Sequence, residues 1–333
     1  MEWFLVLALL ATPAQDPLRP VDSETAFRAA DRGVLYLKTA EGPTPELRLL
    51  ALAHHGIPEN DAAFAALLRK VLEAPLERTD RVAFQARALE QIDRAKYQVR
   101  LAEAAQFLVD NQAKDGLWSR GEPTEFALVV PPLPPAPPLP PGAKPAVLRE
   151  IRIGRRREEP ERGDFSHAQL AVLGLLACHE AKVRVPAETL ERAAKAWVER
   201  QGADGSWDSG VALTASGTGS LLAIRFMQGR KFKDDPDARR GIAWLERHHD
   251  AASDPDPALA LWSLDRAALY WGEERLGAWD WYPDLVRALV GSQRPDGSWL
   301  LGESGSARDT SLALLVLRPR PRPWLRPDPP RRR

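Results

Sequence analysis

Gln293-Arg294-Pro295-Asp296-Gly297-Ser298-Trp299 is the stretch that decides the fold, because its pattern occurs three times in the chain. The other copies are Gln201-Gly202-Ala203-Asp204-Gly205-Ser206-Trp207 and Gln112-Ala113-Lys114-Asp115-Gly116-Leu117-Trp118. A weaker fourth copy, Lys38-Thr39-Ala40-Glu41-Gly42, lacks the tryptophan. Repetition of one pattern along a chain is the signature of a repeat architecture.

Each residue type in this pattern has a physical role at the end of a helix. Glycine adopts the left-handed conformation that ends a helix, and the aspartate before it favours a tight turn. The glutamine amide offers hydrogen bonds to backbone groups left without partners at helix ends, and the tryptophan provides a large flat surface that covers this amide. The expected scaffold-turn residues are Gln112, Gly116, Trp118, Gln201, Gly205, Trp207, Gln293, Gly297 and Trp299.

Outward from the turns, the chain has the periodicity of helices. Apolar residues recur three and four positions apart, and no stretch alternates as a strand does. Start signals at Asp80, Asp164 and Asp309 support three of the helices. The sequence predicts an all-α fold of about six helix hairpins, with helices at 23–38, 45–55, 60–73, 80–92, 96–112, 165–180, 188–201, 212–229, 236–249, 256–272, 279–293 and 308–318.

The prolines and the repeat spacing together predict the domain organisation. Gln201 and Gln293 lie 92 residues apart, close to two hairpins, whereas only one predicted hairpin fits between Gln112 and Gln201. Nine prolines lie between Pro131 and Pro145, and a charge run follows them. We therefore expect a repeat domain at 22–318, with a disordered, exposed Pro-rich and charged insertion at 123–163 and a disordered Pro/Arg tail at 319–333.

The N-terminal ten residues form a short apolar run that precedes Thr12-Pro13-Ala14-Gln15. This run is too short to span a bilayer, and small residues at Thr12 and Ala14 fit a cleavage site. The sequence predicts a signal peptide at 1–14 and export to the periplasm or beyond the cell. Glu2 stands where a basic residue is usual, so a buried N-terminal helix is the alternative. We expect no transmembrane segment.

The charge balance and the single cysteine narrow the function classes. The chain has 46 basic and 46 acidic residues, so its overall charge gives no reason to expect a nucleic-acid partner. Cys178 is the one cysteine, which excludes an internal disulfide framework and a Cys-rich zinc site.

The three turns resemble the QW repeats of squalene and oxidosqualene cyclases, also called prenyltransferase/squalene-oxidase repeats. In that family the repeat joins an outer helix to the next inner helix of an α/α toroid. Across roughly 23–318 the chain is most similar to exported bacterial squalene-cyclase-like repeat proteins. The stretches Asp164–Leu175 and Leu264–Gly272 also resemble theirs. The resemblance implies an α/α toroid; activity has to be argued from the site.

The catalytic acid of the cyclases has no counterpart here. The resemblance aligns their Asp-x-Asp-Asp-Thr-Ala stretch with Ser306-Ala307-Arg308-Asp309-Thr310-Ser311, in which Arg308 occupies the place of the proton donor. A guanidinium does not deliver a proton near neutral pH. Asp309 is better interpreted as a helix N-cap. We therefore expect no catalytic residue of the cyclase type.

No metal or cofactor is expected from the remaining motifs. Asp234-Asp235-Pro236-Asp237 resembles diphosphate-binding motifs but fits the start of an outer helix. Cys178 lacks the aspartate two residues earlier that zinc-dependent prenyltransferases use. The pairs His54-His55 and His248-His249 are adjacent, which does not place two imidazoles on one helix face.

Aromatic residues give the remaining functional signal. Trp262 and Tyr270 share a face of one predicted inner helix, and Asp164 and His167 lie at the start of another. Together with Asp309 they are the possible lining of a central cavity; a closed core is the alternative for the aromatic pair.

Three hypotheses follow for the function. The first is a squalene-cyclase-like protein that is not a working cyclase and binds an apolar isoprenoid or lipid, or a protein partner, outside the cytoplasm. The second is a terpenoid- or lipid-modifying enzyme with other catalytic residues. The third is a structural protein of envelope assembly.

Overall fold

The computed structural model describes residues 23–42, 44–124, 126, 147, 149–208 and 210–317. The predicted signal peptide, the predicted tail and most of 125–148 lie outside these residues. The all-α prediction is confirmed, and each predicted helix has one counterpart. The helices are α1 Ser23–Thr39, α2 Pro45–His54, α3 Ala62–Glu73, α4 Thr79–Asp93, α5 Gln98–Asp110, α6 Phe165–Glu180, α7 Ala187–Glu199, α8 Val211–Met227, α9 Pro236–Leu245, α10 Pro257–Trp271, α11 Trp281–Ser292 and α12 Ser306–Val316.

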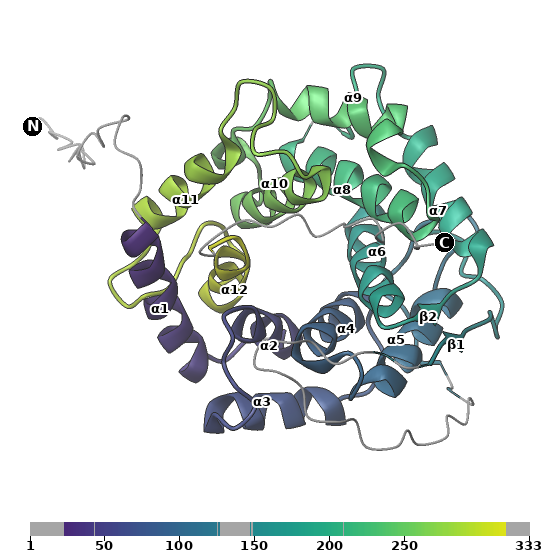
Figure 1. The fold of residues 1–333 in the computed structure, drawn as a ribbon, viewed down its shortest axis with the longest axis horizontal. Helices are drawn as coiled ribbons and strands as arrows, with labels where there is room; N and C mark the ends of the chain where they lie inside the picture. Colours follow the sequence, from purple (N-terminus) through teal and green to yellow (C-terminus); the bar gives the residue numbers. More distant parts are fainter. Residues whose placement is uncertain are drawn as a thin grey trace, which may run out of the picture.

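The helices are arranged in two concentric layers (Figure 1). The even-numbered helices α2 to α12 form the inner layer, in which each contacts the next and α12 returns to contact α2. The odd-numbered helices α1 to α11 lie outside them. We call this arrangement the ring. None of the described helices is both long and apolar enough to cross a membrane.

Inner and outer helices differ in how they are buried. On the outer helix α7, buried residues such as Leu190, Ala193 and Trp197 follow a three- and four-residue spacing and form one apolar stripe. The inner helix α8 is buried almost all round. Its Gly217 has a packing role: a Cβ there would lie 2.7 Å from the ring of Trp207. The small residue therefore lets the turn tryptophan pack on the α8 backbone.

The three turns share one hydrogen-bond scheme. In the second, Gln201 Nε2 donates to Gly205 O and to Asp237 O of the next outer helix, both at 2.9 Å. Gln201 Oε1 accepts from Arg240 at 2.7 Å, and Trp207 Nε1 donates to Trp197 O at 2.9 Å. In the first turn, Gln112 donates to the carbonyls of Gly116 and Thr189 and accepts from Arg192, and Trp118 donates to Leu108 O. In the third turn, Gln293 donates to the carbonyls of Gly297 and Ala29 and accepts from Arg32, and Trp299 donates to Leu289 O.

The glycine of each turn has no room for a side chain. Gly205 has φ +96°, and a Cβ there would lie 2.4 Å from Arg240 O. Gly116 and Gly297 have φ of +84° and +87° and face the carbonyls of Arg192 and Arg32 in the same way. Each turn is therefore pressed against the backbone of the next outer helix. The glutamine partners are carbonyls of the turn and of that helix, which is more specific than the helix-end groups that we expected.

The third turn closes the ring. Its next outer helix is α1, at the other end of the described chain, where Gln293 Nε2 donates to Ala29 O at 2.8 Å. Arg32 donates to Gln293 Oε1, and Gly33 lies under Trp299, where a Cβ would be 2.7 Å from its ring. We call this junction between the third turn and α1 the seam.

The prediction of an exposed, disordered insertion at 123–163 is wrong for its described C-terminal part. Residues 149–163, which we call the return segment, pack against the ring. Its strand β1 (Ile151–Arg152) pairs in parallel with β2 (Val183–Arg184), and Ile151 and Ile153 are buried. A two-residue strand has too few positions to show alternation, so it could not be predicted from periodicity.

The charge run within the return segment is solvated only in part, since Arg156 and Glu158 are exposed while Arg155 and Arg157 are partly buried. Arg156 N donates to Asp110 Oδ1 at 2.8 Å, and the Arg157 guanidinium donates to Asn111 Oδ1. Asp110 and Asn111 are fully buried at the end of α5, where Asp110 also accepts from Thr124 Oγ1 at 2.5 Å. Buried polar groups need partners. The Arg156 amide and the Arg157 guanidinium therefore supply hydrogen bonds to buried polar groups at the end of α5.

Candidate functional site

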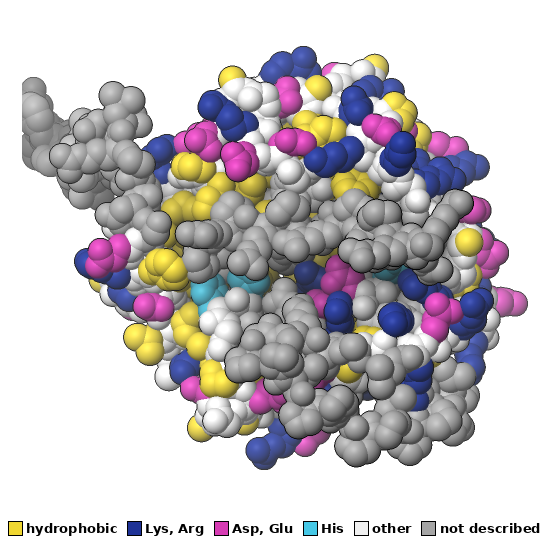
Figure 2. Space-filling model, in the orientation of Figure 1, with side chains coloured by type: hydrophobic (Ala, Val, Ile, Leu, Met, Phe, Trp, Pro, Cys, Tyr) yellow, Lys and Arg dark blue, Asp and Glu magenta, His cyan; other side chains and the backbone are white. Residues whose placement is uncertain are grey.

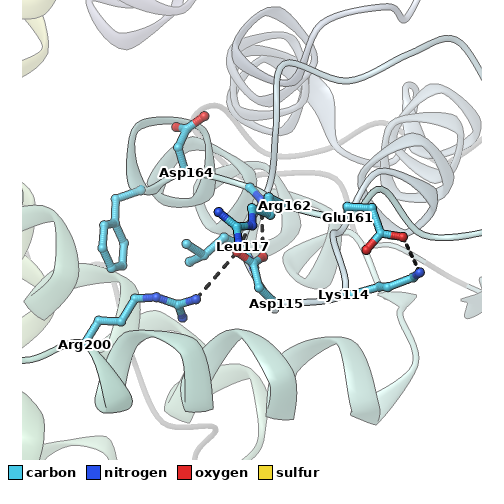
Figure 3. A pocket seen from close by; sticks show the side chains of 9 residues that line it. Lys114, Asp115, Leu117, Glu161, Arg162, Asp164 and Arg200 are labelled. Carbon is cyan, nitrogen blue, oxygen red and sulfur yellow. Dashed lines mark hydrogen bonds and ion pairs between the residues drawn. The ribbon is translucent and has the colours of Figure 1, made fainter.

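A cavity of about 740 Å³ lies where the first turn meets the return segment and the start of α6 (Figure 3). Its volume is within the range of ligand sites, but such sites are usually lined by apolar residues. Six of the nine lining residues here carry ionisable side chains. We call this the rim cavity; its lining is Lys114, Asp115, Leu117, Glu161, Arg162, Gly163, Asp164, Phe165 and Arg200.

Ion pairs on the cavity wall link the first turn to its neighbours. Lys114 pairs with Glu161 of the return segment, and Arg200 approaches Asp115 to 3.5 Å (Figure 3). Both pairs are partly exposed, so each contributes little to stability. Arg162 is exposed and makes no ion pair within the described residues. The wall therefore presents charges of both signs to solvent.

Asp164 and His167 come together at the start of α6, as their spacing predicts. Asp164 caps the helix, since its Oδ1 accepts from His167 N at 2.9 Å. Its Oδ2 lies 2.7 Å from His167 Nδ1, which fixes the orientation of the imidazole. Asp164 lines the rim cavity, and about half of its side chain is exposed. The lining of the rim cavity includes Asp164 but neither Trp262 nor Tyr270 of α10.

Trp262 and Tyr270 do share one face of α10, and both are buried. The guanidinium of Arg266, one helical turn after Trp262, stacks over the indole at 4.0 Å from its centroid. Phe84 of α4 lies on another side of Trp262, with ring centroids 6.1 Å apart. These rings pack against protein groups, which favours the closed-core alternative for this pair.

A second buried arginine belongs to the same region. Arg87 Nη1 lies 3.2 Å from Glu90 Oε2 and 3.9 Å from Glu180 Oε2. Desolvation opposes the charge of Arg87, but the two carboxylates outweigh it and raise its pKa. Desolvation lowers the pKa of Arg266, although Tyr270 and Asp265 act in the opposite direction. The ring interior between α4, α6 and α10 therefore holds two guanidinium groups with different electrostatic compensation.

Asp309 lies elsewhere, and its predicted role as an N-cap is wrong. The residue before α12 is Gly305, with φ +96°, and Asp309 is fully buried in the first helical turn. Its Oδ2 accepts from Leu301 N at 2.9 Å and from Gly302 N at 3.2 Å, which holds the preceding loop. Arg308 binds both carboxylate oxygens of Asp256, the N-cap residue of α10. These residues connect two inner helices.

The other motifs have local partners. Asp235 caps α9 through Asp237 N and Ala238 N and pairs with Arg225 at 2.6 Å, in keeping with the capping interpretation. His248 and His249 stack on different tryptophans, with centroids 4.3 and 4.1 Å apart.

Cys178 offers no thiolate. It is buried, and desolvation raises the pKa of its thiol, which opposes the thiolate form that binds metals. Within the described ranges, no group of three or more His, Cys, Asp or Glu side chains could hold a metal ion.

No protein-family model matches the chain, and no curated protein matches it.

Sequence reasoning missed Arg87, Glu90 and Arg266 in the interior and Arg162 and Arg200 in the rim cavity. Arg266 did carry a signal, because Asp265 and Arg266 are the two charged residues of an otherwise mostly apolar α10. The rim cavity carried none, since the return segment that builds its wall looked like a solvated charge run.

Proposed function

We propose that this chain is a squalene-cyclase-like α/α toroid without cyclase activity, which binds a polar, charged segment of a protein partner outside the cytoplasm. The observation that carries the proposal is the rim cavity, with its volume of about 740 Å³ and its mixed charges. A peptide segment presents backbone hydrogen-bonding groups and side chains of both signs. Such a segment matches this wall better than an isoprenoid does.

The ring interior supports the part of the proposal that denies cyclase activity. Cyclisation passes through carbocations, and a fixed cation nearby raises their energy. Arg87 and Arg266 are both buried between the inner helices, and the aromatic side chains beside them are packed. We therefore expect no cyclic product from squalene or from linear prenyl diphosphates. We also expect none from Arg308→Asp, because Ser306 and the interior arginines remain.

The binding proposal is tested by mass spectrometry of proteins and lipids that co-purify with the native chain. Arg162→Glu reverses an exposed charge on the cavity wall, and Arg28→Glu makes the same change on α1, where the side chain is 73% exposed. We expect one protein to co-purify in stoichiometric amount with the wild type and with Arg28→Glu. Its yield should fall about tenfold or more with Arg162→Glu. A stoichiometric apolar lipid retained by both variants would overturn the proposal.

A second candidate is an enzyme at the same cavity, favoured by the Asp164–His167 pair. A carboxylate that orients an imidazole is a common arrangement for a general base, and His167 Nε2 has no partner within the described residues. Incubation of the purified protein with squalene, prenyl diphosphates and a panel of acyl esters tests it. Turnover that His167→Gln abolishes, with binding of the protein partner unchanged, would favour the enzyme.

Export is part of the proposal. We expect the mature chain to begin near Gln15, because the apolar run ends at a small-residue site. N-terminal sequencing of the native protein checks this, and a cytoplasmic chain that retains Met1 would contradict it.

A further inference from the structure

The three carboxylates that line the rim cavity, those of Asp115, Glu161 and Asp164, already have partners. A backbone amide and a guanidinium bind the first, and a lysine ammonium binds the second. The amide and the imidazole of His167 bind the two oxygens of the third. A basic side chain that enters the cavity therefore has to compete with existing bonds at each carboxylate.

Arg162 is the cation of the rim cavity that has no ion pair. It is exposed, and no hydrogen bond or ion pair joins its guanidinium to any part of the described chain. The other two lining cations, Lys114 and Arg200, are bound by carboxylates of the wall (Figure 3). A guanidinium binds a carboxylate through two parallel hydrogen bonds. The donor group that the wall leaves available therefore favours a ligand with a carboxylate.

An apolar surface lies close to this cation. Phe165 lines the same cavity and is partly exposed. Its ring centroid lies 4.6 Å from that of Trp197, which is fully buried, so the ring packs on the core. Arg162 and Phe165 are three positions apart in the chain, a stretch that spans at most about 10 Å. A ligand that reaches the guanidinium can therefore contact the ring as well.

We infer, building on the proposed function, that the partner segment in the rim cavity is acidic, with a carboxylate that binds Arg162 and an apolar side chain that packs on Phe165. Alternate side chains of an extended peptide lie on one face about 7 Å apart, which is within the reach from Arg162 to Phe165. A basic segment is disfavoured, because the carboxylates of the wall are already bound. A hydrocarbon ligand is disfavoured, because it desolvates the guanidinium and gives it no acceptor.

Binding of short fluorescent peptides to the full chain tests the inference. The probe is the peptide Ser-Phe-Ser-Glu-Ser-Phe-Ser with both ends blocked, so that glutamate carries its one carboxylate and has a phenylalanine two residues away on either side. Lysine or glutamine replaces the glutamate in two matched peptides. We expect fluorescence anisotropy to show about tenfold tighter binding of the glutamate peptide than of either. The preference should weaken as the salt concentration rises.

Two variants assign the preference to one side chain. Arg162→Gln removes the proposed carboxylate-binding group. Arg69→Gln is the matched control, because Arg69 is an exposed arginine of α3 that lies outside the cavity lining and makes no ion pair within the described ranges. The glutamate preference should disappear in Arg162→Gln and persist in Arg69→Gln. Both variants should keep the wild-type melting temperature, since both side chains are exposed.

A fourth peptide tests the apolar contact without changing the protein. Serine replaces both phenylalanines in it, and we expect it to bind about threefold more weakly than the glutamate probe. Equal affinity of these two peptides would contradict the contact with Phe165.

The acidic preference fails separately from the proposed function. Equal or tighter binding of the lysine peptide would overturn the inference, as would a glutamate preference that survives in Arg162→Gln or a lack of binding by all four peptides. A protein partner whose capture depends on Arg162 would still stand in each of these cases. Selection of the glutamate peptide without any co-purifying protein would support the acidic preference and contradict the proposed function.

Discussion

The first and second turns have the same backbone pattern and the same glutamine bonds, but their surroundings differ. Around Gln201 the turn contacts only its own hairpins, and the side chain is partly exposed. Around Gln112 the return segment adds a second layer. Arg155 Nη2 donates to Gln112 Oε1 at 3.3 Å, and Lys114 N donates to Pro160 O at 2.9 Å. Gln112 becomes fully buried as a result.

This difference between the two turns distinguishes the contacts that join hairpins from the contacts that form the candidate site. The second turn makes the glutamine and tryptophan bonds without a return segment, so these shared bonds do not depend on that layer. At the first turn, the return segment also forms one wall of the rim cavity. Gly163 shows how closely the wall fits, since a Cβ there would lie 2.4 Å from Trp118 N. We conclude that the insertion turned one scaffold turn into a candidate binding site.

The largest expected effect tests what the turns share. Trp207→Ala and Trp118→Ala should each lower the free energy of unfolding by about 3–5 kcal/mol, since both rings are fully buried. Guanidinium denaturation measures the loss. Trp271→Ala is the control, because that ring is only partly buried and lies outside the turns. Unchanged stability in both turn variants would show that the turns do not brace the ring.

The glycines test the same point with a smaller effect. Gly205→Ala and Gly116→Ala should each cost about 1–3 kcal/mol, because the new Cβ meets a backbone carbonyl at 2.4 Å in a left-handed conformation. Gly229 also has a positive φ, of +69°, but nothing lies within 4 Å of an added Cβ. Gly229→Ala therefore isolates the conformational cost. If Gly205→Ala loses no more stability than Gly229→Ala, the close approach of Gly205 to Arg240 O does not affect stability.

Replacing the glutamine should affect stability more in the first turn than in the second. Gln112→Leu should destabilise the protein by about 1 kcal/mol more than Gln201→Leu, because it also removes the acceptor of Arg155 in a buried setting. Chemical denaturation of the two variants measures the difference. In an Arg155→Ala background the excess should shrink, which a double-mutant cycle detects. Equal losses in both turns would mean that the return segment is not coupled to the scaffold.

The smallest effect concerns the aspartate of the turn, which accepts a hydrogen bond from a serine hydroxyl in the second and third turns. The amide and then the hydroxyl of Ser206 hold the pKa of Asp204 below its ordinary value. A depressed pKa stabilises the fold at pH above the ordinary carboxyl range, and this contribution is lost as pH falls through the folded-state pKa. Ser206→Ala should therefore raise the pKa of Asp204, and carboxylate NMR titration measures the shift. The first turn has Leu117 at the matching position and offers no such hydroxyl. An unchanged pKa of Asp204 in Ser206→Ala would show that the hydroxyl does not contribute to the lowered pKa.

The helices and turns were predictable because their signals are local. Helical periodicity and a glycine after a helix end depend on neighbours in sequence, and the twelve predicted helices were found. The return segment was not predictable, because Asp110 and Asn111 bind it across about 46 positions of sequence. Arg155, Arg156 and Arg157 in isolation have the composition of a solvated run.

The interior charges were missed for a related reason. A charged residue on an amphipathic helix is normally exposed, but an inner helix is covered on nearly all sides. Arg87 and Glu90 lie one helical turn apart in α4, a spacing equally typical of a surface ion pair. Only the ring, by surrounding α4 with other helices, makes that pair an interior one.

The seam has a consequence for the order in which the chain folds. Its contacts join residues 261 and 264 positions apart, from Arg32 and Ala29 to Gln293. During synthesis, α1 emerges first and has no partner for this face until α11 and the third turn exist. The contact of α2 with α12 in the inner layer is equally distant in the chain, whereas the other contacts between successive inner helices join neighbouring hairpins. We therefore expect the docking of chain-distant helices to be the last step of folding, with the growing ring until then an open arc whose α1 exposes an unpaired face.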